Sequence, residues 1–173
     1  MTVAPCKPTI LSPAACLACS IALTTPSVTN VYIAGCDRLG AVVMGRTSFD
    51  KNEGDGGWGE GGPAGDTPCF VVTHHEPTTS HPPLYTFVTD GVASAIEQAK
   101  HAAGDNVVGL HGATVMQQAL PLGLVDEIRV HVIPVLLGGG TPLFATLDSA
   151  ISLERTQALM TPAATHLGFR VVR

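Results

Sequence analysis

Residues 125–144 read VDEIRVHVIPVLLGGGTPLF, and this stretch constrains the fold more than any other part of the chain. Its β-branched and aliphatic residues predict a long strand that the glycine run 138–140 ends abruptly. A glycine inside regular structure costs about 0.5–1 kcal/mol relative to alanine, so consecutive glycines indicate an unusual backbone path. Taken alone, the stretch is equally compatible with a simple glycine-rich connection between two strands.

The composition is that of one compact globular domain. The chain has 173 residues, of which 45% are hydrophobic and 13% charged, and a chain of this length buries about 70% of its unfolded surface. With a formal net charge of -5 and nine Lys and Arg residues, it has no basic stripe to neutralise nucleic-acid phosphates. The sequence beyond its N-terminal segment has no apolar run of membrane-spanning length. We therefore expect a cytoplasmic protein that binds neither nucleic acid nor membrane.

Cysteine and histidine spacing gives no metal motif. The five cysteines are irregularly spaced, and although Cys16 and Cys19 form a CxxC pair, no second pair completes a zinc site. His111, His131 and His166 also lack ligand spacing. We expect buried free thiols, structural histidines and no bound metal.

The N-terminal region allows a second interpretation. Residues 10–23 form a mildly apolar run after Lys7, which faintly resembles a signal peptide or a lipid-attachment site at Cys19. Pro13 interrupts this run and only one basic residue precedes it, so the cytoplasmic expectation is favoured over export.

From residue 41 onward, the pattern alternates between strands and helices. Apolar periodicity predicts a helix over 92–103, with Asp90 as its N-cap and Gly104 at its end. The other elements expected are strands at 41–44, 69–72, 85–88, 106–110, 151–159 and 166–172, and helices starting at 47 and 114. Alternation implies parallel pairing, and the helix-free C-terminus implies antiparallel strands. The predicted fold class is α/β, with a mixed, mostly parallel sheet.

Three of the predicted strands end in small or polar residues. These junctions begin at Gly45, Thr73 and His111. Ligands collect at the carboxyl edge of open α/β sheets, where helix N-termini offer unpaired N–H groups to phosphate. Arg46 could add a forked contact to phosphate oxygens, and His74 a further donor. The glycines are equally explained as turn residues, and Arg46 as a solvated cation.

Two further features could take part in function, an adjacent acidic pair and a glycine-rich loop. Asp126 and Glu127 are adjacent in a predicted strand and so point to opposite faces, which indicates a solvated strand start rather than an acid/base pair. The glycine-rich segment around Trp58 either covers a substrate or is a plain surface loop.

The ordered set VVMGRTSFD, CFVVTH, FVTDGVASAIEQAKHAAGDNVVGLHGATVMQQAL, GLVDEIRVHVIPVLLGGGTPLF and THLGFRVV resembles a known family. It is similar to the dihydrofolate-reductase-like family typified by the C-terminal reductase domain of riboflavin biosynthesis. The resemblance covers about residues 41–173. It implies a three-layer dihydrofolate-reductase-like fold, NADPH as cofactor and a homodimer.

The resemblance also implies which residues bind the cofactor. Cofactor phosphate would be held at a helix start, the adenosine ribose and its 2′-phosphate after the next strand, and the diphosphate at a third junction. In that order, the residues are Gly45, Arg46 and Thr47; Thr73 and His74; and His111, Gly112, Ala113, Thr114 and Val115. His111 departs from the family, which often has glycine there.

The front of the chain departs further. Family members usually open with a strand like S-L-D-G-F-I-A and a helix, whereas the only similar segment here is 27–35, which has Asn30 in place of the acidic residue. Residues 1–40 are therefore treated as an atypical N-terminal segment with room for one strand, and 41–173 as the reductase-like domain. No catalytic residue is assigned.

Two functions are expected from these observations. The first is an NADPH-dependent reductase acting on a small heterocyclic or carbonyl substrate, in which the protein positions the hydride donor against its acceptor. The alternative is a non-catalytic dimeric relative that keeps the scaffold but has lost activity through its altered N-terminus.

Overall fold

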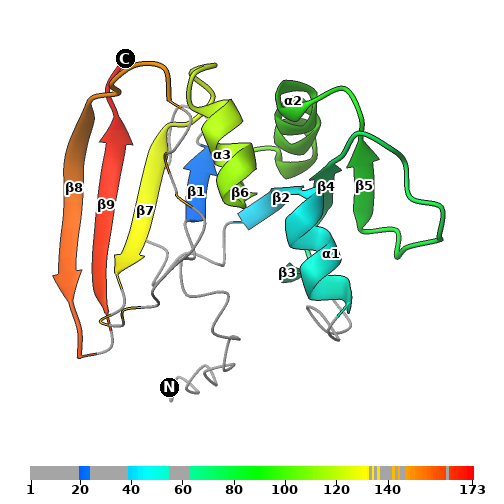
Figure 1. Cartoon of the computed structure of the whole chain (residues 1–173), viewed down its shortest axis with the longest axis horizontal. Helices are drawn as coiled ribbons and strands as arrows, with labels where there is room; N and C mark the ends of the chain where they lie inside the picture. The colour runs from blue at the N-terminus through cyan, green and yellow to red at the C-terminus, as the bar shows by residue number, and fades with distance from the viewer. Residues whose placement is uncertain are drawn as a thin grey trace.

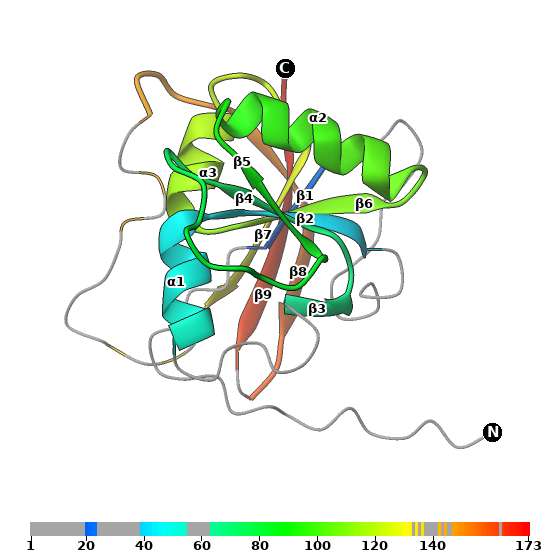
Figure 2. The same cartoon turned by 90° about the vertical axis from the view of Figure 1, so that its right-hand side faces the viewer.

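The chain folds into a central sheet with helices on both of its faces (Figures 1 and 2). The computed structural model describes residues 20–23, 39–54, 63–132, 147–162 and 164–173, with residues 134, 136, 142 and 144. The strands are β1 (Ser20–Leu23), β2 (Leu39–Gly45), β3 (Pro63–Asp66), β4 (Cys69–Val72), β5 (Tyr85–Val88), β6 (Val107–His111), β7 (Glu127–Val132), β8 (Leu153–Met160) and β9 (Thr165–Val171). The helices are α1 (Arg46–Gly54), α2 (Val92–Ala103) and α3 (Ala113–Ala119).

Eight of the nine described strands, all except β3, form one mixed sheet in the order β5-β4-β2-β6-β1-β7-β9-β8. Strands β5, β4, β2 and β6 pair in parallel, whereas β1 pairs antiparallel with both β6 and β7. Beyond β7, strands β9 and β8 are antiparallel, because no helix connects them. The predicted α/β class, with a mixed sheet and antiparallel C-terminal strands, is confirmed. The sheet is less parallel than predicted, because β1 pairs antiparallel with β6 and β7 and confines parallel pairing to β5, β4, β2 and β6.

The two sheet faces carry separate cores. On what we call the α2 face, helices α2 and α3 pack over β2, β4 and β6. On the opposite face, here the α1 face, Phe49 of α1 packs on Val42, Met44 and Val71. Alternate residues of one strand thus serve different cores, which explains the near-continuous apolar runs of β2 and β4.

Helix α2 matches the predicted range, although its N-terminal cap differs from the prediction. Its buried residues recur at helical spacing: Val92, Ala95, Ile96, Ala99 and Ala103. The N-cap is Gly91, at φ 92°, and no side chain donates or accepts a capping bond, so the expectation for Asp90 was wrong. The chain that leaves β5 turns into α2 at a glycine with positive φ, and no carboxylate caps the helix. Gly104, at φ 57°, ends the helix as predicted.

Strand β7 is shorter than the long strand predicted from the opening motif. It ends at Val132, two residues before Pro134. Proline has no N–H to donate to a sheet ladder, so it limits pairing despite the β propensity around it. Val135, Leu137 and the triple glycine lie outside the described residues.

The N-terminal region contributes a strand at a central position of the sheet. Strand β1 lies between β6 and β7, with Ile21 in register with Leu110 on one side and Ile128 on the other. The segment 27–35, which resembles the family's first strand, lies outside the described residues. Trp58 and the Cys16–Cys19 pair lie outside them as well.

Candidate functional site

Three strand ends predicted to bind cofactor meet at one edge of the sheet. Strands β4, β2 and β6 are parallel neighbours, with Gly45 in register with Val72 and Met44 in register with His111. Because their carboxyl ends reach the same level, the residues that follow each strand form a continuous edge. The structure therefore brings the predicted junctions together.

Helices α1 and α3 begin side by side at this edge. Gly112 is the N-cap of α3, at φ 103°, and a Cβ there would lie 2.9 Å from Ser48 Oγ of α1. A Cβ on Gly45 would lie 3.3 Å from Val115 Cγ2 of α3. These glycines therefore have a packing role, because each lets one helix approach the start of the other. The first N–H groups of an α-helix have no partner within the helix, so a helix start at this edge favours an anion.

Arg46 starts α1 and already has intramolecular partners. Its Nε donates to Asp50 Oδ1 at 2.7 Å, and its guanidinium lies 6.0 Å from the centre of the Phe49 ring. The side chain is 38% exposed, so it is neither buried nor a freely solvated cation. A guanidinium offers five N–H donors, so binding Asp50 through Nε leaves its forked end able to reach a ligand.

The residues after β4 form a local turn. Thr73 is buried, its Oγ1 donates to the His75 carbonyl at 2.9 Å, and its backbone N–H donates to Val88 O at 3.0 Å. His74 is exposed beside it. Thr73 therefore fixes the turn, whereas His74 presents its imidazole to a ligand.

His111 is the last residue of β6 and lies on the α1 face, in register with Met44. Burial lowers the pKa of its imidazole below the usual value of 6.5, so it is neutral at neutral pH. A neutral imidazole can donate or accept one hydrogen bond without adding charge beside an anion site.

The last predicted residues lie in the first turns of the two helices. Thr47 and Thr114 are exposed, so their hydroxyls can reach a ligand. The Val115 side chain is buried in the core, and Ala113 has no polar side-chain group, so these two can offer only their backbone. Ser48 was missed by the sequence reasoning, although its position two residues after Arg46 places it over Gly112.

A second polar region lies on the α1 face of β7 and β9. Arg129 Nη2 donates to Glu127 Oε2 at 3.2 Å, and these side chains are only 10% and 13% exposed. The expectation that Glu127 is solvated was wrong, because the approach of β1 and β9 on either side of β7 places this carboxylate within the sheet. The pair costs desolvation energy, which its mutual contact only partly offsets.

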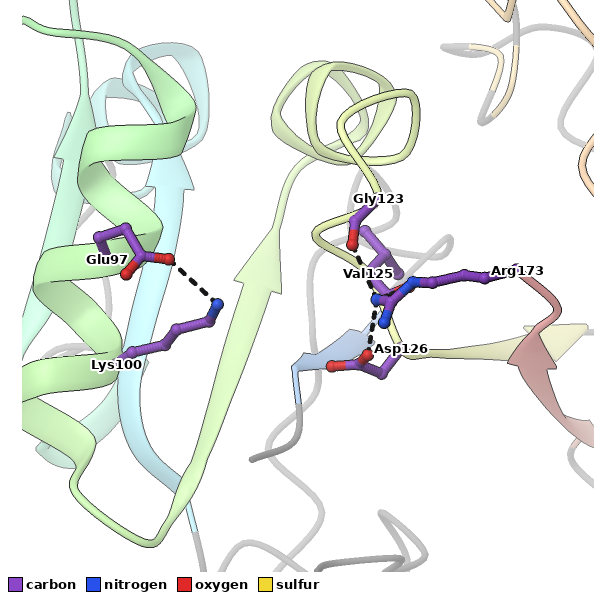
Figure 3. A network of polar contacts seen from close by, with 6 residues as sticks. All are labelled: Glu97, Lys100, Gly123, Val125, Asp126 and Arg173. Carbon is purple, nitrogen blue, oxygen red and sulfur yellow. Dashed lines mark hydrogen bonds and ion pairs between the residues drawn. The ribbon is translucent and has the colours of Figure 1, made fainter. Parts of the chain in front are cut away.

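Asp126, the other acidic residue expected to be solvated, is also engaged. Arg173 Nη2 donates to Asp126 Oδ1 at 2.7 Å and to the carbonyl of Gly123 at 2.7 Å (Figure 3). These contacts connect Arg173, two residues beyond the end of β9, to the segment between α3 and β7. The acidic start of β7 is therefore structural.

The α2 face has an apolar cavity of about 230 Å³ near the end of α3. It is lined by Leu120, Ile128, Phe144, Leu147, Ser149, Ala150, Ile151 and Leu153. It lies away from the three strand ends, and none of the predicted cofactor residues lines it.

The described part of the chain holds neither a cluster of metal ligands nor a membrane-spanning helix. Within those residues, no cluster of three or more His, Cys, Asp and Glu side chains has the proximity needed for a metal ion. Cys69 is a buried free thiol, as expected, and burial raises its pKa to about 12. None of the described helices combines the length and apolarity needed to cross a membrane.

Two curated proteins of Bacillus subtilis (strain 168) are similar to parts of the chain. Uncharacterized protein YyaP is 34% identical over 68 residues, which is 39% of this chain and 36% of that protein. Uncharacterized protein YwjB is 31% identical over 92 residues, which is 53% of this chain and 52% of that protein. The chain thus spans about a third to a half of the relatives that it matches.

Several solved structures share the fold. A protein named for riboflavin biosynthesis from Shewanella sp. PV-4 aligns with a TM-score of 0.66 and 24% identity, over 87% of this chain and 85% of that one. A diaminohydroxyphosphoribosylaminopyrimidine deaminase/5-amino-6-(5-phosphoribosylamino)uracil reductase from Thermotoga maritima aligns with a TM-score of 0.54 and 14% identity, over 78% and 46%. Dihydrofolate reductase from Enterococcus faecalis, complexed with NADP(H), aligns with a TM-score of 0.50 and 17% identity, over 77% and 74%.

The fold is therefore dihydrofolate-reductase-like, as the resemblance of the sequence implied. The RibD C-terminal domain family matches residues 39–166, which include every strand end described above. The chain belongs to the RibD C-terminal domain family.

Proposed function

We propose that this protein is an NADPH-dependent reductase of a small heterocyclic or carbonyl substrate. Membership of the RibD C-terminal domain family supports a function of the reductase class. The observation that carries the cofactor assignment is the shared edge of β4, β2 and β6, where Gly45 ends β2 and Thr73 and Gly112 follow β4 and β6.

The residues at this edge fit a dinucleotide phosphate. Gly112 has positive φ and no Cβ, so a diphosphate can approach the backbone closely where α3 begins. Arg46 and Thr47 supply a charged and a hydroxyl donor on the first turn of α1. Thr73 and His74 would lie beside the ribose and its 2′-phosphate, and His111 would pass close to the cofactor as a neutral side chain. When bound, NADPH supplies the hydride.

The substrate class is inferred from related structures. The Thermotoga maritima structure is named as a reductase of 5-amino-6-(5-phosphoribosylamino)uracil, and the Enterococcus faecalis structure as a dihydrofolate reductase. Both names point to nitrogen heterocycles. We therefore assign a heterocycle, or a carbonyl attached to one, to the acceptor position, and we expect the enzyme to work as a cytoplasmic homodimer.

The cofactor proposal is tested by isothermal titration of NADPH into the protein and into Arg46→Ala. Losing a charge-assisted hydrogen bond should weaken binding by about 1–2 kcal/mol, which is about five- to thirty-fold in Kd. Arg155→Ala, an exposed arginine on edge strand β8, is the matched control and should bind as the wild type does. Equal NADPH affinity in all three proteins would contradict the phosphate contact.

Turnover is tested separately. NADPH oxidation would be followed at 340 nm with 5-amino-6-(5-phosphoribosylamino)uracil and with dihydrofolate as acceptors. If NADPH binds but neither acceptor oxidises it, the substrate assignment is wrong and the cofactor proposal stands. Absence of NADPH binding at millimolar concentration would favour the alternative, a non-catalytic relative. That alternative draws support from His111, which stands where the family often has glycine.

A further inference from the structure

Two histidines from different strands contact each other on the α1 face. His131 of β7 and His166 of β9 are directly opposite in the antiparallel register. Their Nδ1 atoms are 2.6 Å apart, with ring centroids 4.8 Å apart and ring planes at 69°. Both residues are partly buried. The pair therefore forms a side-chain link across the β7–β9 ladder.

This geometry limits the number of protons that the pair can hold at its contact. With one proton on the shared side, one Nδ1 donates and the other accepts, whether the pair as a whole is neutral or singly charged. If both imidazoles are protonated, two Nδ1–H groups face each other and two positive charges lie in direct contact. Like charges directly opposite in adjacent strands are destabilising. The contact therefore holds one proton and excludes a second.

The surrounding charges oppose a second proton as well. Arg129 lies two residues before His131 on the same face, and its neighbour Glu127 is engaged with it. On β9, Arg170 contacts Glu154 of β8, and Gly168 lies between Arg170 and His166. On the β8 side, His166 is opposite Leu159. Burial, His166 and Arg129 together lower the pKa of His131 below its usual value.

The pair is placed where its loss would open one end of a ladder. Within the described residues, the ladder continues past His131 and His166 to one further register pair, Val132 and Thr165. At the other end, Glu127 is in register with Arg170. Strand β8 pairs with β9 alone in the described sheet, so the C-terminal strands are attached to the rest of the sheet through β7.

We propose that His131 and His166 form a pH-responsive clasp that joins β7 to β9 when they share one proton and releases that end of the ladder when both are protonated. Acidification through the range in which histidine titrates would then fray the ladder at Val132 and Thr165. The opposite end would remain paired. The clasp does not depend on the proposed reductase function.

The direct test is amide hydrogen exchange of the unmodified protein at pH 7.5 and 5.5. Protection factors, which correct for the intrinsic rate at each pH, should fall at Val132 and Thr165 as the pH is lowered, because repulsion between two protonated imidazoles opens this end of the ladder. Protection at Ile128 and Phe169, near the other end of the same ladder, is the internal control and should change little. Equal changes in protection at both ends of the ladder would contradict the proposal.

Variants provide a second test. The double substitution His131→Asn, His166→Asn keeps a neutral cross-strand hydrogen bond, whereas His101→Asn changes an exposed histidine on α2. Between pH 7.5 and 5.5, the Tm of the wild type and of His101→Asn should fall more than the Tm of the double variant. If the Tm of the double variant falls as steeply as that of the wild type, the proposal is wrong.

Discussion

Gly40 lies where β2 passes the end of α2 with no room for a side chain. A Cβ at this position would lie 2.7 Å from Asn106 Cβ and 2.8 Å from Ala103 Cα. Because one of these atoms belongs to the helix backbone, the clash cannot be relieved by a rotamer change. This glycine sets how closely α2 can approach the sheet.

We expect Gly40→Ala to lower the free energy of unfolding by about 1–3 kcal/mol, as other overpacked positions do. Gly109→Ala is the comparison, because its Cβ would approach the flexible Leu39 side chain at 3.0 Å and the backbone only at an ordinary contact distance, 4.0 Å from Ala41 O. Urea unfolding followed by circular dichroism measures both. An effect of Gly40→Ala no larger than that of Gly109→Ala would show that α2 can shift to accommodate the methyl group.

His111 gives a prediction about pH. Burial lowers its pKa in the folded state, so the unfolded chain binds this proton more readily than the folded chain does. Its contribution to stability is therefore present above the unfolded pKa of about 6.5 and is lost as the pH falls through the folded pKa. His111→Gln should flatten the fall in Tm between pH 7 and 5. His101→Gln, on an exposed helix surface, should leave that fall unchanged.

At the scale of single elements, β7 combines an apolar side with a charged one. Ile128 is 1% exposed on the α2 face, whereas Glu127 and Arg129 form their ion pair on the α1 face. The Arg129 and Glu127 side chains are only 10% and 13% exposed, so water screens their charges weakly. Removing one of the two charges should therefore lower the free energy of unfolding more than removing both.

Glu127→Gln should destabilise the protein by about 3 kcal/mol, because it leaves the Arg129 guanidinium buried without its carboxylate. The double substitution Glu127→Leu, Arg129→Met removes both charges and should recover most of that loss. Arg170→Ala, which breaks an ion pair whose side chains are 61% and 59% exposed, should cost less than about 1 kcal/mol. Equal losses for Glu127→Gln and the double variant would show that the unpaired Arg129 charge is not what destabilises the single variant.

At the scale of the whole molecule, the C-terminal strands expose apolar side chains on the α2 face. Val132 is 50% exposed and Met160 is 81% exposed, and both are in register with Thr165, which lies between them. Helices α2 and α3 pack over β2, β4 and β6, at the other end of the sheet (Figure 1). Exposed apolar residues grouped in this way are typical of a protein–protein contact.

The proposed homodimer can be checked by light scattering coupled to size-exclusion chromatography. The wild type should have about twice the chain mass of 17.8 kDa. Met160→Glu should shift the mass toward the monomer, because it would place a charge in the apolar contact. Leu122→Glu, an equally drastic change at an exposed turn residue, is the control and should remain dimeric. A monomeric wild type would exclude the homodimer.

The fold followed largely from local sequence patterns. Strands 69–72 and 85–88 and helix 92–103 were expected at the bounds observed, because their apolar periodicity is strong and their ends are marked by polar residues, glycine or proline. The cap at Gly91 was not expected, since a carboxylate at Asp90 is the commoner choice and backbone φ is not encoded in a side-chain pattern. Pro134 indicated that β7 would end early, as it does at Val132. The prediction of a longer strand gave more weight to the strong β propensity of the residues around this proline.

What the sequence determined by itself was the alternation of elements, the family resemblance and the identity of the strand ends that carry glycine, arginine and histidine. These depend on short-range periodicity and on residue types, which can be read along the chain. The tertiary structure decided which strands are neighbours, and so which of these residues share an edge. It also decided that β1 lies between β6 and β7, that Ser48 meets Gly112, and that His131 contacts His166 across 35 residues of sequence. Contacts of this kind depend on strand order and register, which are set by the packing of the whole sheet rather than by any single segment.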